Sequence, residues 1–176
     1  MAFVRSGRDF SIAWTHEMTR IERLGNDRAK ITALAWWHFE QWGELMGFAS
    51  RAAYCEALGQ WSAGQEVPAV LVAVDGDEVQ GSVTVRESEM TVRPLLGPWL
   101  SQLFVVSRYR RRGLGAALVS AATEHARALG FREIYLFTSG TLPAFYAGLG
   151  WKERERVLYL GQERVVMQYD LTAAGR

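Results

Sequence analysis

The chain has 176 residues, of which 49% are hydrophobic and 22% are charged, which is typical of one globular domain that buries its own core. The net charge of +1 excludes a protein that binds nucleic acid through its overall charge. Cys55 is the only cysteine, which excludes an internal disulfide and favours the reducing cytoplasm. No stretch has the ~18 apolar residues of a membrane span, and the first nine residues lack the apolar segment of a signal peptide. We expect one cytoplasmic domain over residues 1–176, with no membrane partner.

The first third of the chain predicts one short strand and two helices. Brief alternation over residues 10–14 indicates the strand, and Asn26-Asp27 can cap a long helix. Apolar residues then recur at helical spacing and form one stripe, which consists of Ile31, Ala35, Phe39, Trp42 and Met46. Gly47 is expected to end this helix, and residues 49–59 are expected to form a shorter second helix.

The character of the chain changes after Pro68. An apolar run over residues 69–74 predicts a buried strand, and Asp75-Gly76-Asp77 predicts a hairpin into an alternating strand over residues 79–87. Gly97-Pro98 breaks the chain before the next strand. The remaining expected elements are a strand over 99–106, a helix over 113–129, a strand over 134–138, a helix over 142–149, and two strands over 156–160 and 164–170 around Gly161-Gln162.

The resulting order of elements is β-α-α-β-β-β-α-β-α-β-β. Strands alternate with helices in the middle of the chain and pair as hairpins at both ends. The fold class is therefore α/β, or α+β in the wider sense. This order predicts a mixed sheet with flanking helices and one central parallel β-α-β crossover.

A basic turn between a strand and a helix is the most informative segment of the sequence. It spans residues 107–115 and ends in Gly113-Leu114-Gly115. The first turn of a helix has free backbone N–H groups and the positive end of the helix dipole, and glycine lets a ligand approach the backbone closely. With arginines nearby, this combination is typical of a site for an anion such as a pyrophosphate.

Other phosphate-binding motifs fit this turn poorly. The chain has no Gly-x-x-x-x-Gly-Lys-Ser/Thr run, and a Gly-x-Gly-x-x-Gly fingerprint would require glycine where Leu118 stands. Glu133 has nearly the spacing of a ribose-binding acid, but it opens its strand instead of following it. On this turn alone, a helix start with solvated arginines is a competing interpretation.

A second motif further along the chain supports the phosphate-binding interpretation. Arg110-Arg111-Arg112-Gly113-Leu114-Gly115 matches the pattern Gln/Arg-x-x-Gly-x-Gly/Ala, and Ala144-Phe145-Tyr146-Ala147-Gly148-Leu149-Gly150-Trp151 follows on the next helix. On a β-α-β-α frame, the two motifs together resemble the Gcn5-related N-acetyltransferase (GNAT) superfamily over residues 69–171. The Gly150-Trp151 pair stands where that family usually has Gly-Phe.

The resemblance implies a GNAT-type fold in which the sheet is mixed and mostly antiparallel. The two parallel strands of its β-α-β core are splayed apart, and coenzyme A enters between them. Residues 68–171 would form the cofactor-binding core, and residues 1–67 would form variable helices on the acceptor side. The reaction implied is direct attack of an amine on acetyl-coenzyme A.

The cofactor contacts are carried over from the family position by position. The pantetheine arm would bond like an added strand to the main chain of Leu103, Phe104 and Val105. The pyrophosphate would be held by the turn that consists of Arg110, Arg111, Arg112, Gly113, Leu114, Gly115 and Ala116. Ser139 stands where many relatives have an Asn that contacts the cofactor arm, and its hydroxyl can still form a hydrogen bond there.

Tyr146 stands at the position of the family's general acid. Its phenol, with an ordinary pKa of ~10, can protonate a leaving thiolate whose pKa is ~8.5. The resemblance also implies that the backbone N–H of Val105 polarises the thioester carbonyl. Without the motif, Tyr146 would be interpreted as an aromatic residue packed beside Phe145 and Trp151.

The general base is left open by the sequence. The strand before the basic turn begins with Trp99-Leu100-Ser101-Gln102 and holds no carboxylate, although relatives often have one there. Glu87 and Glu89 are the substitutes, and water relayed through Ser101 or Gln102 is an equal alternative. For each glutamate, a solvated surface position is the competing interpretation.

Aromatic residues crowd the first helix. Phe39 and Trp42 lie on the apolar stripe and are expected in the core. Trp36 and Trp37 flank it and are candidates to wall an acceptor pocket, where aromatic faces attract a cation, with Glu40 or Glu44 holding an ammonium group. Ordinary packing against the sheet is the alternative. This composition favours a small cationic amine as the acceptor.

The three histidines do not predict a metal site. His16, His38 and His125 are scattered, and neither any pair of them nor any histidine with Cys55 has metal-ligand spacing. His125 falls on the apolar face of the helix over residues 113–129 and is expected to be a core residue.

The sequence therefore supports one leading function and two alternatives. The leading one is an N-acetyltransferase whose acceptor is a primary amine on a small molecule or a protein; many members of the family it resembles are homodimers. A module that binds coenzyme A or acyl-CoA without turnover is the first alternative. The second is a nucleic-acid-binding protein that uses Arg108, Arg110, Arg111 and Arg112, which the near-neutral total charge disfavours. We expect no nucleic-acid partner and no metal.

Overall fold

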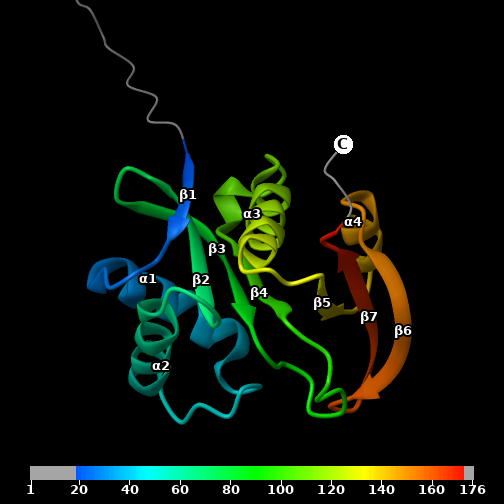
Figure 1. The fold of residues 1–176 in the computed structure, drawn as a ribbon. Helices are drawn as coiled ribbons and strands as arrows, with labels where there is room; N and C mark the ends of the chain where they lie inside the picture. The colour runs from blue at the N-terminus through cyan, green and yellow to red at the C-terminus, as the bar shows by residue number, and fades with distance from the viewer. Residues whose placement is uncertain (1–18, 173–176) are drawn as a thin grey trace, which may run out of the picture.

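The computed structural model describes residues 19–172, so the strand expected over residues 10–14 lies outside the described residues. One seven-stranded sheet has the order β1-β2-β3-β4-β5-β7-β6 (Figure 1). Its strands are β1 (Arg20–Arg23), β2 (Ala69–Asp75), β3 (Glu78–Arg86), β4 (Trp99–Val105), β5 (Glu133–Thr138), β6 (Lys152–Tyr159) and β7 (Gln162–Asp170). The described helices are α1 (Arg28–His38), α2 (Arg51–Ala63), α3 (Leu114–Ala128) and α4 (Leu142–Gly148), with two short helical turns, η1 (Phe39–Gly43) and η2 (Ser107–Tyr109).

The pairing of the strands confirms the predicted sheet. β4 and β5 are parallel, and every other neighbouring pair in the described sheet is antiparallel. The order of strands and helices is also the predicted one. Its first strand, however, is β1, which pairs with β2 and was not predicted from the sequence.

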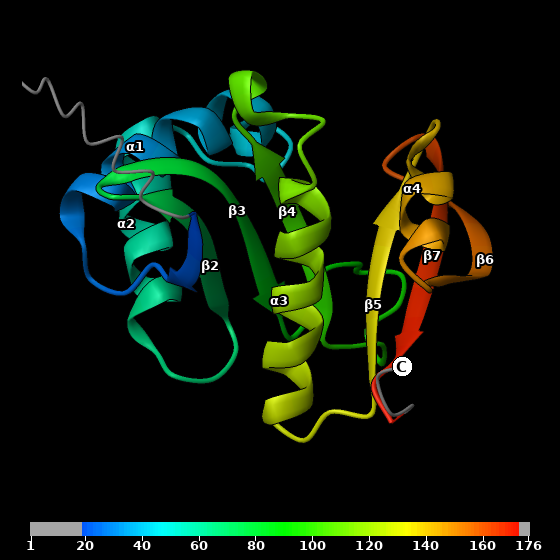
Figure 2. The ribbon, with the colours of Figure 1, turned by 90° about the horizontal axis from the view of Figure 1, so that it is seen from above.

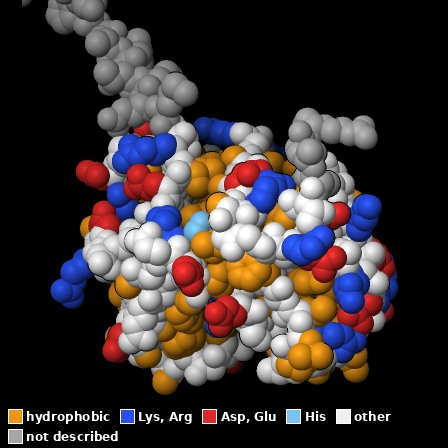
Figure 3. Space-filling model, in the orientation of Figure 1, with side chains coloured by type: hydrophobic (Ala, Val, Ile, Leu, Met, Phe, Trp, Pro, Cys, Tyr) orange, Lys and Arg blue, Asp and Glu red, His pale blue; other side chains and the backbone are white. Residues whose placement is uncertain are grey.

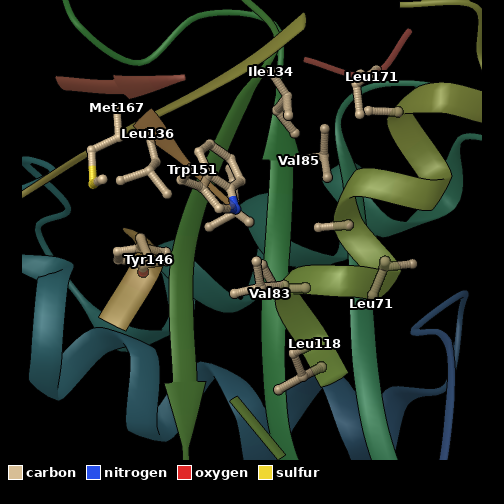
Figure 4. Close-up of a cluster of buried hydrophobic side chains, with 14 of the residues drawn as sticks. Leu71, Val83, Val85, Leu118, Ile134, Leu136, Tyr146, Trp151, Met167 and Leu171 are labelled. Atoms are coloured by element: carbon tan, nitrogen blue, oxygen red, sulfur yellow. The ribbon is translucent and has the colours of Figure 1, made fainter. Parts of the chain in front are cut away.

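The sheet separates two hydrophobic layers because alternate residues of each strand face opposite sides. In β2, Leu71 and Ala73 join the cluster under α3, whereas Val70, Val72 and Val74 join the cluster under α1 and α2. Figure 2 shows α3 along one side of β3 and β4, with α1 and α2 on the other side of β2 and β3. Figure 4 shows the α3-side cluster, in which Tyr146 and Trp151 lie near Leu136 and Met167.

The first helix begins as the sequence predicts but ends differently. Asp27 caps α1, and its carboxylate accepts hydrogen bonds from the N–H groups of Ala29 and Lys30 at 3.0 and 3.1 Å. After His38 the helix widens into the π-helical turn η1, and Gly47 then adopts a positive φ of 76°. A π turn changes the direction of the side chains that follow it, so the apolar stripe is not continuous.

The parallel strands β4 and β5 are splayed, as expected. They share a single registered pair, Trp99 with Tyr135, near their amino ends, and no further pairing joins them. Beyond Trp99, β4 therefore has no strand partner on the β5 side. A bulge in β4 adds to the divergence, because Ser101 pairs with Thr84 and Phe104 with Ser82, which leaves two residues opposite Val83.

Candidate active site

A cleft with a volume of about 810 Å³ opens between the diverging strands β4 and β5. β4 and its bulge form one wall, and β5 with the start of α4 forms the other. The turn before α3 closes one end, and η1 with the following turn closes the other. The lining residues predicted from the sequence are Glu89, Ser101, Gln102, Leu103, Phe104, Val105, Arg110, Arg111, Gly113, Gly115, Ala116, Ser139 and Tyr146. Arg112 and Leu114 do not line it.

The turn before α3 lines the cleft with free backbone donors. Gly113 is the N-cap with a φ of 83°, and no side chain caps the helix. The first intrahelical bond of this turn is donated by Ala117, so the N–H groups of Leu114, Gly115 and Ala116 have no carbonyl partner within the helix. Open space surrounds the Cα of Gly113, and 3.7 Å separates a Cβ at Gly115 from the nearest side chain. The turn therefore offers donors and room to a phosphate group.

The arginines of this turn have separate roles. Arg110 is fixed at the cleft, because its Nε donates to the carbonyl oxygen of Val105 at 2.8 Å. Arg108 forms an ion pair with Glu78 instead, and its guanidinium lies 4.9 Å from the ring centroid of Tyr109. On the face shown in Figure 3, basic and acidic side chains are interspersed, so no single basic patch dominates it. Arg108 and Arg110 are therefore held by different partners.

The backbone of β4 points a donor into the cleft. The N–H of Val106 donates to the carbonyl of Gln80 at 2.9 Å, which makes this a hydrogen-bonded position of the β3–β4 ladder. Hydrogen-bonded and non-hydrogen-bonded pairs alternate in an antiparallel ladder, so Val105 opposite Gly81 is a non-hydrogen-bonded position. The N–H of Val105 therefore points away from β3, toward the gap before β5.

The bulge gives β4 an unusual run of polar side chains. Ser101 pairs with Thr84 and lies on the α1 side of the sheet, and Gln102, with a φ of 52°, lies on the same side against Met46 and Tyr54. Consecutive strand residues normally face opposite sides, so the bulge is what brings both into the cleft. Ser101 Oγ and Gln102 Oε1 are buried and accept no hydrogen bond from the described residues.

Glu89 lies beside these two acceptors. Its side chain is only 16% exposed, and its Oε2 is 3.3 Å from Arg86 Nη1 without forming a hydrogen bond. Burial raises the pKa of Glu89, and the positive charge of Arg86 and the neighbouring Ser101 hydroxyl oppose that rise. Glu87, the other sequence candidate, is exposed. The structure thus places one of the two candidate glutamates in the cleft and the other outside it.

A buried chain of hydrogen bonds holds Gln102 in place. The amide of Gln102 donates to the hydroxyl of Tyr54, which lies 3.2 Å from His38 Nδ1, and His38 Nε2 lies 2.8 Å from Ser82 Oγ. Because the hydroxyl of Tyr54 accepts from Gln102, its own proton goes to His38 Nδ1, and His38 donates from Nε2 to Ser82. Burial lowers the pKa of His38 to about 3, so this imidazole is neutral.

Tyr146 lies on the opposite wall of the cleft. Its ring packs in the α3-side cluster, edge-on to Phe145 at a centroid distance of 5.0 Å and to Trp151 at 6.0 Å. Its hydroxyl makes no hydrogen bond with the described residues. Burial raises the pKa of Tyr146 to about 12, so the phenol keeps its proton at neutral pH. The residue is therefore a packed aromatic that also lines the cleft with a protonated phenol.

The aromatic residues of α1 are arranged differently from the sequence prediction. Trp36 is 52% exposed and lies under the guanidinium of Arg51, 3.2 Å from the ring centroid, and Arg51 also pairs with Glu40. Trp37 stacks on Phe104 at 5.8 Å. None of Trp36, Trp37 and Glu40 lines the cleft, and Glu44 is exposed outside it.

Trp42 lines the cleft, a position that the sequence analysis predicted for Trp36 and Trp37. The stripe predicted a core position for Trp42, but it is half-buried and lines the cleft with Gln41, Leu45 and Met46. The reason is η1: the π turn moves these four residues off the α1 register. Helical periodicity alone cannot reveal such a turn.

The other lining residues missed by the sequence come from the far wall and from β7. They are Leu136, Phe137, Thr138, Leu142, Phe145 and Arg164, together with Leu100 of β4. The adjacency of Phe145 to Tyr146 was a usable signal. No sequence signal predicts Arg164 as a site residue, because it is distant in the chain from both motifs and reaches the cleft through the pairing of β7 with β5.

The histidines and acids give no metal site. No group of three His, Cys, Asp or Glu side chains suited to a metal ion occurs among residues 19–172. His125 is half-buried instead of a core residue, with its Nε2 3.2 Å from Arg23 Nη1. None of the described helices is long and apolar enough to cross a membrane.

Comparisons with known proteins agree with this geometry. A model of the acetyltransferase (GNAT) family matches residues 31–151. Among solved structures, an aminoglycoside 6′-N-acetyltransferase complexed with coenzyme A is 17% identical, with a TM-score of 0.70 over 89% of this chain and 99% of that chain. YncA from Salmonella typhimurium, a putative acetyltransferase with acetyl-CoA, is 18% identical, with a TM-score of 0.62 over 90% and 97%. NAA60 from Arabidopsis thaliana with acetyl-CoA is 19% identical, with a TM-score of 0.63 over 87% and 99%. No curated protein sequence matches significantly.

Proposed function

Because the chain belongs to the GNAT acetyltransferase family and uses acetyl-coenzyme A, we propose that it acetylates a primary amine by direct attack within the β4–β5 cleft. One observation carries this proposal. A protonated tyrosine and a buried glutamate, Tyr146 and Glu89, line the same cleft, and the uncapped start of α3 with its free N–H groups lines it too. An acyl transfer to an amine needs an acid, a base and a site for the acyl carrier.

The cleft fits coenzyme A in its shape and in its donors. The unpaired N–H groups at Leu114, Gly115 and Ala116, with Arg110 and Arg111, suit the pyrophosphate. The free edge of β4 suits the amides of the pantetheine arm, which bond as an added strand would. Ser139 lines the same wall and accepts a hydrogen bond from Arg164, so its hydroxyl proton is available to the arm. When bound, the cofactor supplies the acetyl thioester.

Glu89 is the proposed general base. An acceptor amine is mostly protonated at neutral pH and must lose a proton before or during attack. A carboxylate whose pKa is raised by burial takes that proton more readily than an exposed one. Ser101 Oγ and Gln102 Oε1 supply further acceptors beside it, so the ammonium group is held by oxygen atoms from several directions.

Tyr146 is the proposed general acid, and Val105 is the proposed carbonyl-polarising donor. The phenol holds its proton until the departing sulfur needs it, since its pKa is about 12. The N–H of Val105 points into the gap, where negative charge develops on oxygen. The remaining acceleration comes from holding two reactants side by side.

A thermal-shift experiment with acetyl-coenzyme A tests the site. Gly115→Glu places a carboxylate at the helix start without backbone strain, because Gly115 has an ordinary φ and space for a Cβ. Ala117→Glu is the matched control, since Ala117 is exposed on the same helix and does not line the cleft. A ligand at 100 times its Kd stabilises the folded state by about 2.7 kcal/mol, which raises Tm by about 5–10 °C at this size.

The wild type and Ala117→Glu are expected to show this shift, and Gly115→Glu is expected to lose it. An equal shift in all three proteins would contradict the assignment of the pyrophosphate to this turn. Thiol release from acetyl-coenzyme A on addition of primary amines then tests turnover. A protein that binds acetyl-coenzyme A but releases no thiol with any amine would contradict the catalytic proposal.

A further inference from the structure

One charged side chain in the cleft is neither acid, base nor phosphate ligand in the proposed acetyl transfer. Arg164 of β7 donates from Nη1 to Ser139 Oγ at 3.1 Å, while its Nε is buried without a hydrogen-bond partner. No carboxylate of residues 19–172 forms an ion pair with it. A buried charged donor left unpaired costs free energy, whereas an anion that pairs with it recovers that cost. The guanidinium therefore lacks an anionic partner within the described chain.

The strand register places Arg164 on the face of the sheet that is opposite to α3. We call this face the acceptor side of the cleft. Val165 belongs to the cluster under α3, so Arg164 and Val166 face the other side, where Val166 packs with Met90 and Trp99. The guanidinium carbon of Arg164 lies 5.8 Å from the ring centroid of Phe137 on that side. Ser101 and Gln102 face the same side, whereas the turn for the pyrophosphate starts the helix on the opposite side.

The balance of charges in the cleft restricts the acceptor. The charged side chains that line it among the described residues are Glu89, Arg110, Arg111 and Arg164. Two of these, Arg110 and Arg111, belong to the phosphate turn. The acceptor side is thus left with one carboxylate and one guanidinium. A polycation would need several carboxylates, and a simple amine would leave Arg164 unpaired.

We infer that the acceptor is an amino-carboxylate, whose ammonium group lies at Glu89 and Gln102 and whose carboxylate is bound by Arg164. This inference rests on the proposed function. Arginine binds a carboxylate through two parallel N–H donors, and the Nε and the terminal nitrogen Nη2 of Arg164 form such a fork. Trp42, Leu45 and Met46 line the same cleft with apolar side chains, so the acceptor carries an apolar side chain.

Matched pairs of substrates test this inference. L-Methionine, L-leucine and L-phenylalanine are compared with their carboxamides, which keep the amine and remove the negative charge. We expect the wild type to acetylate at least one acid with a kcat/KM 10-fold or more above its amide. Arg164→Gln is expected to lower kcat/KM for the acid about 10–100-fold. It is expected to change kcat/KM for the amide and the KM for acetyl-coenzyme A much less, because among the described residues a single hydrogen bond, to Ser139, joins Arg164 to the proposed cofactor site. Arg164→Lys, which keeps the charge but not the fork, is expected to recover part of the loss.

An equilibrium measurement and a control variant complete the test. With coenzyme A present, the acid is expected to raise Tm of the wild type but not of Arg164→Gln. Arg156→Gln is the control, because Arg156 lies on the same hairpin, pairs with Glu153 and Glu163, and does not line the cleft. It is expected to behave as the wild type.

Three results would overturn the inference. They are equal use of acids and amides, no acetylation of any acid, and a rise in the KM for acetyl-coenzyme A in Arg164→Gln as large as the loss for the acid. The last result would assign Arg164 to the cofactor. Failure of the proposed function is a separate outcome, since it appears as no thiol release with any amine, acid or amide.

Discussion

Tyr146→Phe separates the chemical role of the hydroxyl from the packing role of the ring. The hydroxyl makes no hydrogen bond with the described residues, so its removal leaves no partner unpaired. The ring contacts with Phe145 and Trp151, at centroid distances of 5.0 and 6.0 Å, are kept. The free energy of unfolding is therefore expected to change by less than about 0.5 kcal/mol.

The loss of activity is expected to be much larger. A general acid contributes a factor of about 10²–10⁴ to the rate, which corresponds to about 2.7–5.5 kcal/mol of transition-state stabilisation. The assay is thiol release at saturating acetyl-coenzyme A, with urea unfolding on the same samples. Because the pKa of Tyr146 is raised to about 12, the wild-type kcat is expected to show no alkaline loss from this phenol below pH 10.

Tyr135→Phe is the matched control for this experiment. Burial also raises the pKa of Tyr135 to about 12, but its hydroxyl donates to Glu133 and it does not line the cleft. It is expected to keep full kcat and to lose some stability with the hydrogen bond. If Tyr146→Phe keeps kcat within threefold of the wild type, the assignment of Tyr146 as general acid is refuted.

Further predictions concern a carboxylate, an imidazole and two glycines. The pKa of Glu89 is raised in the folded state above its ordinary 4.5, so the free energy of unfolding falls as the pH rises from 4.5 through the raised pKa. Glu89→Gln is therefore expected to raise Tm at pH 8, with a smaller gain at pH 4. Its kcat is expected to fall about 100-fold or more, and an unchanged kcat would exclude Glu89 as the base. The pKa of His38 is lowered from 6.5 to about 3, so the unfolded chain binds more protons than the folded one between these pH values. The free energy of unfolding is expected to fall by up to about 1.4 kcal/mol per pH unit as the pH drops below 6.5. Urea unfolding of His38→Asn from about pH 7.5 to 4.5 should show a smaller dependence of this free energy on pH. A Cβ at Gly81 would lie 2.6 Å from the carbonyl oxygen of Phe104, so Gly81→Ala is expected to cost about 1–3 kcal/mol, whereas Gly59→Ala in α2 has open space and is expected to gain about 0.5–1 kcal/mol; equal urea midpoints for the two variants would contradict this packing argument.

The sequence by itself determined the order of the elements after Asp27 and the cofactor end of the site. Hairpin signals, the apolar run before Asp75 and the periodicity of the helix after Gly113 are local, so each follows from spacing within a few residues. The turn that includes Gly113 and the helix that carries Tyr146 both line the cleft because each motif is contiguous in the chain.

The acceptor end was decided by the tertiary structure. Ser101 and Gln102 share a face only because of the β4 bulge, and Trp42 enters the cleft only because α1 widens into a π turn. Both irregularities break the periodicity on which sequence prediction depends. Arg164 reaches the site through the pairing of β7 with β5. The burial that leaves its Nε without a hydrogen-bond partner among the described residues and raises the pKa of Glu89 arises only when distant segments meet. Desolvation is a property of the packed molecule, so no local pattern in the chain encodes it.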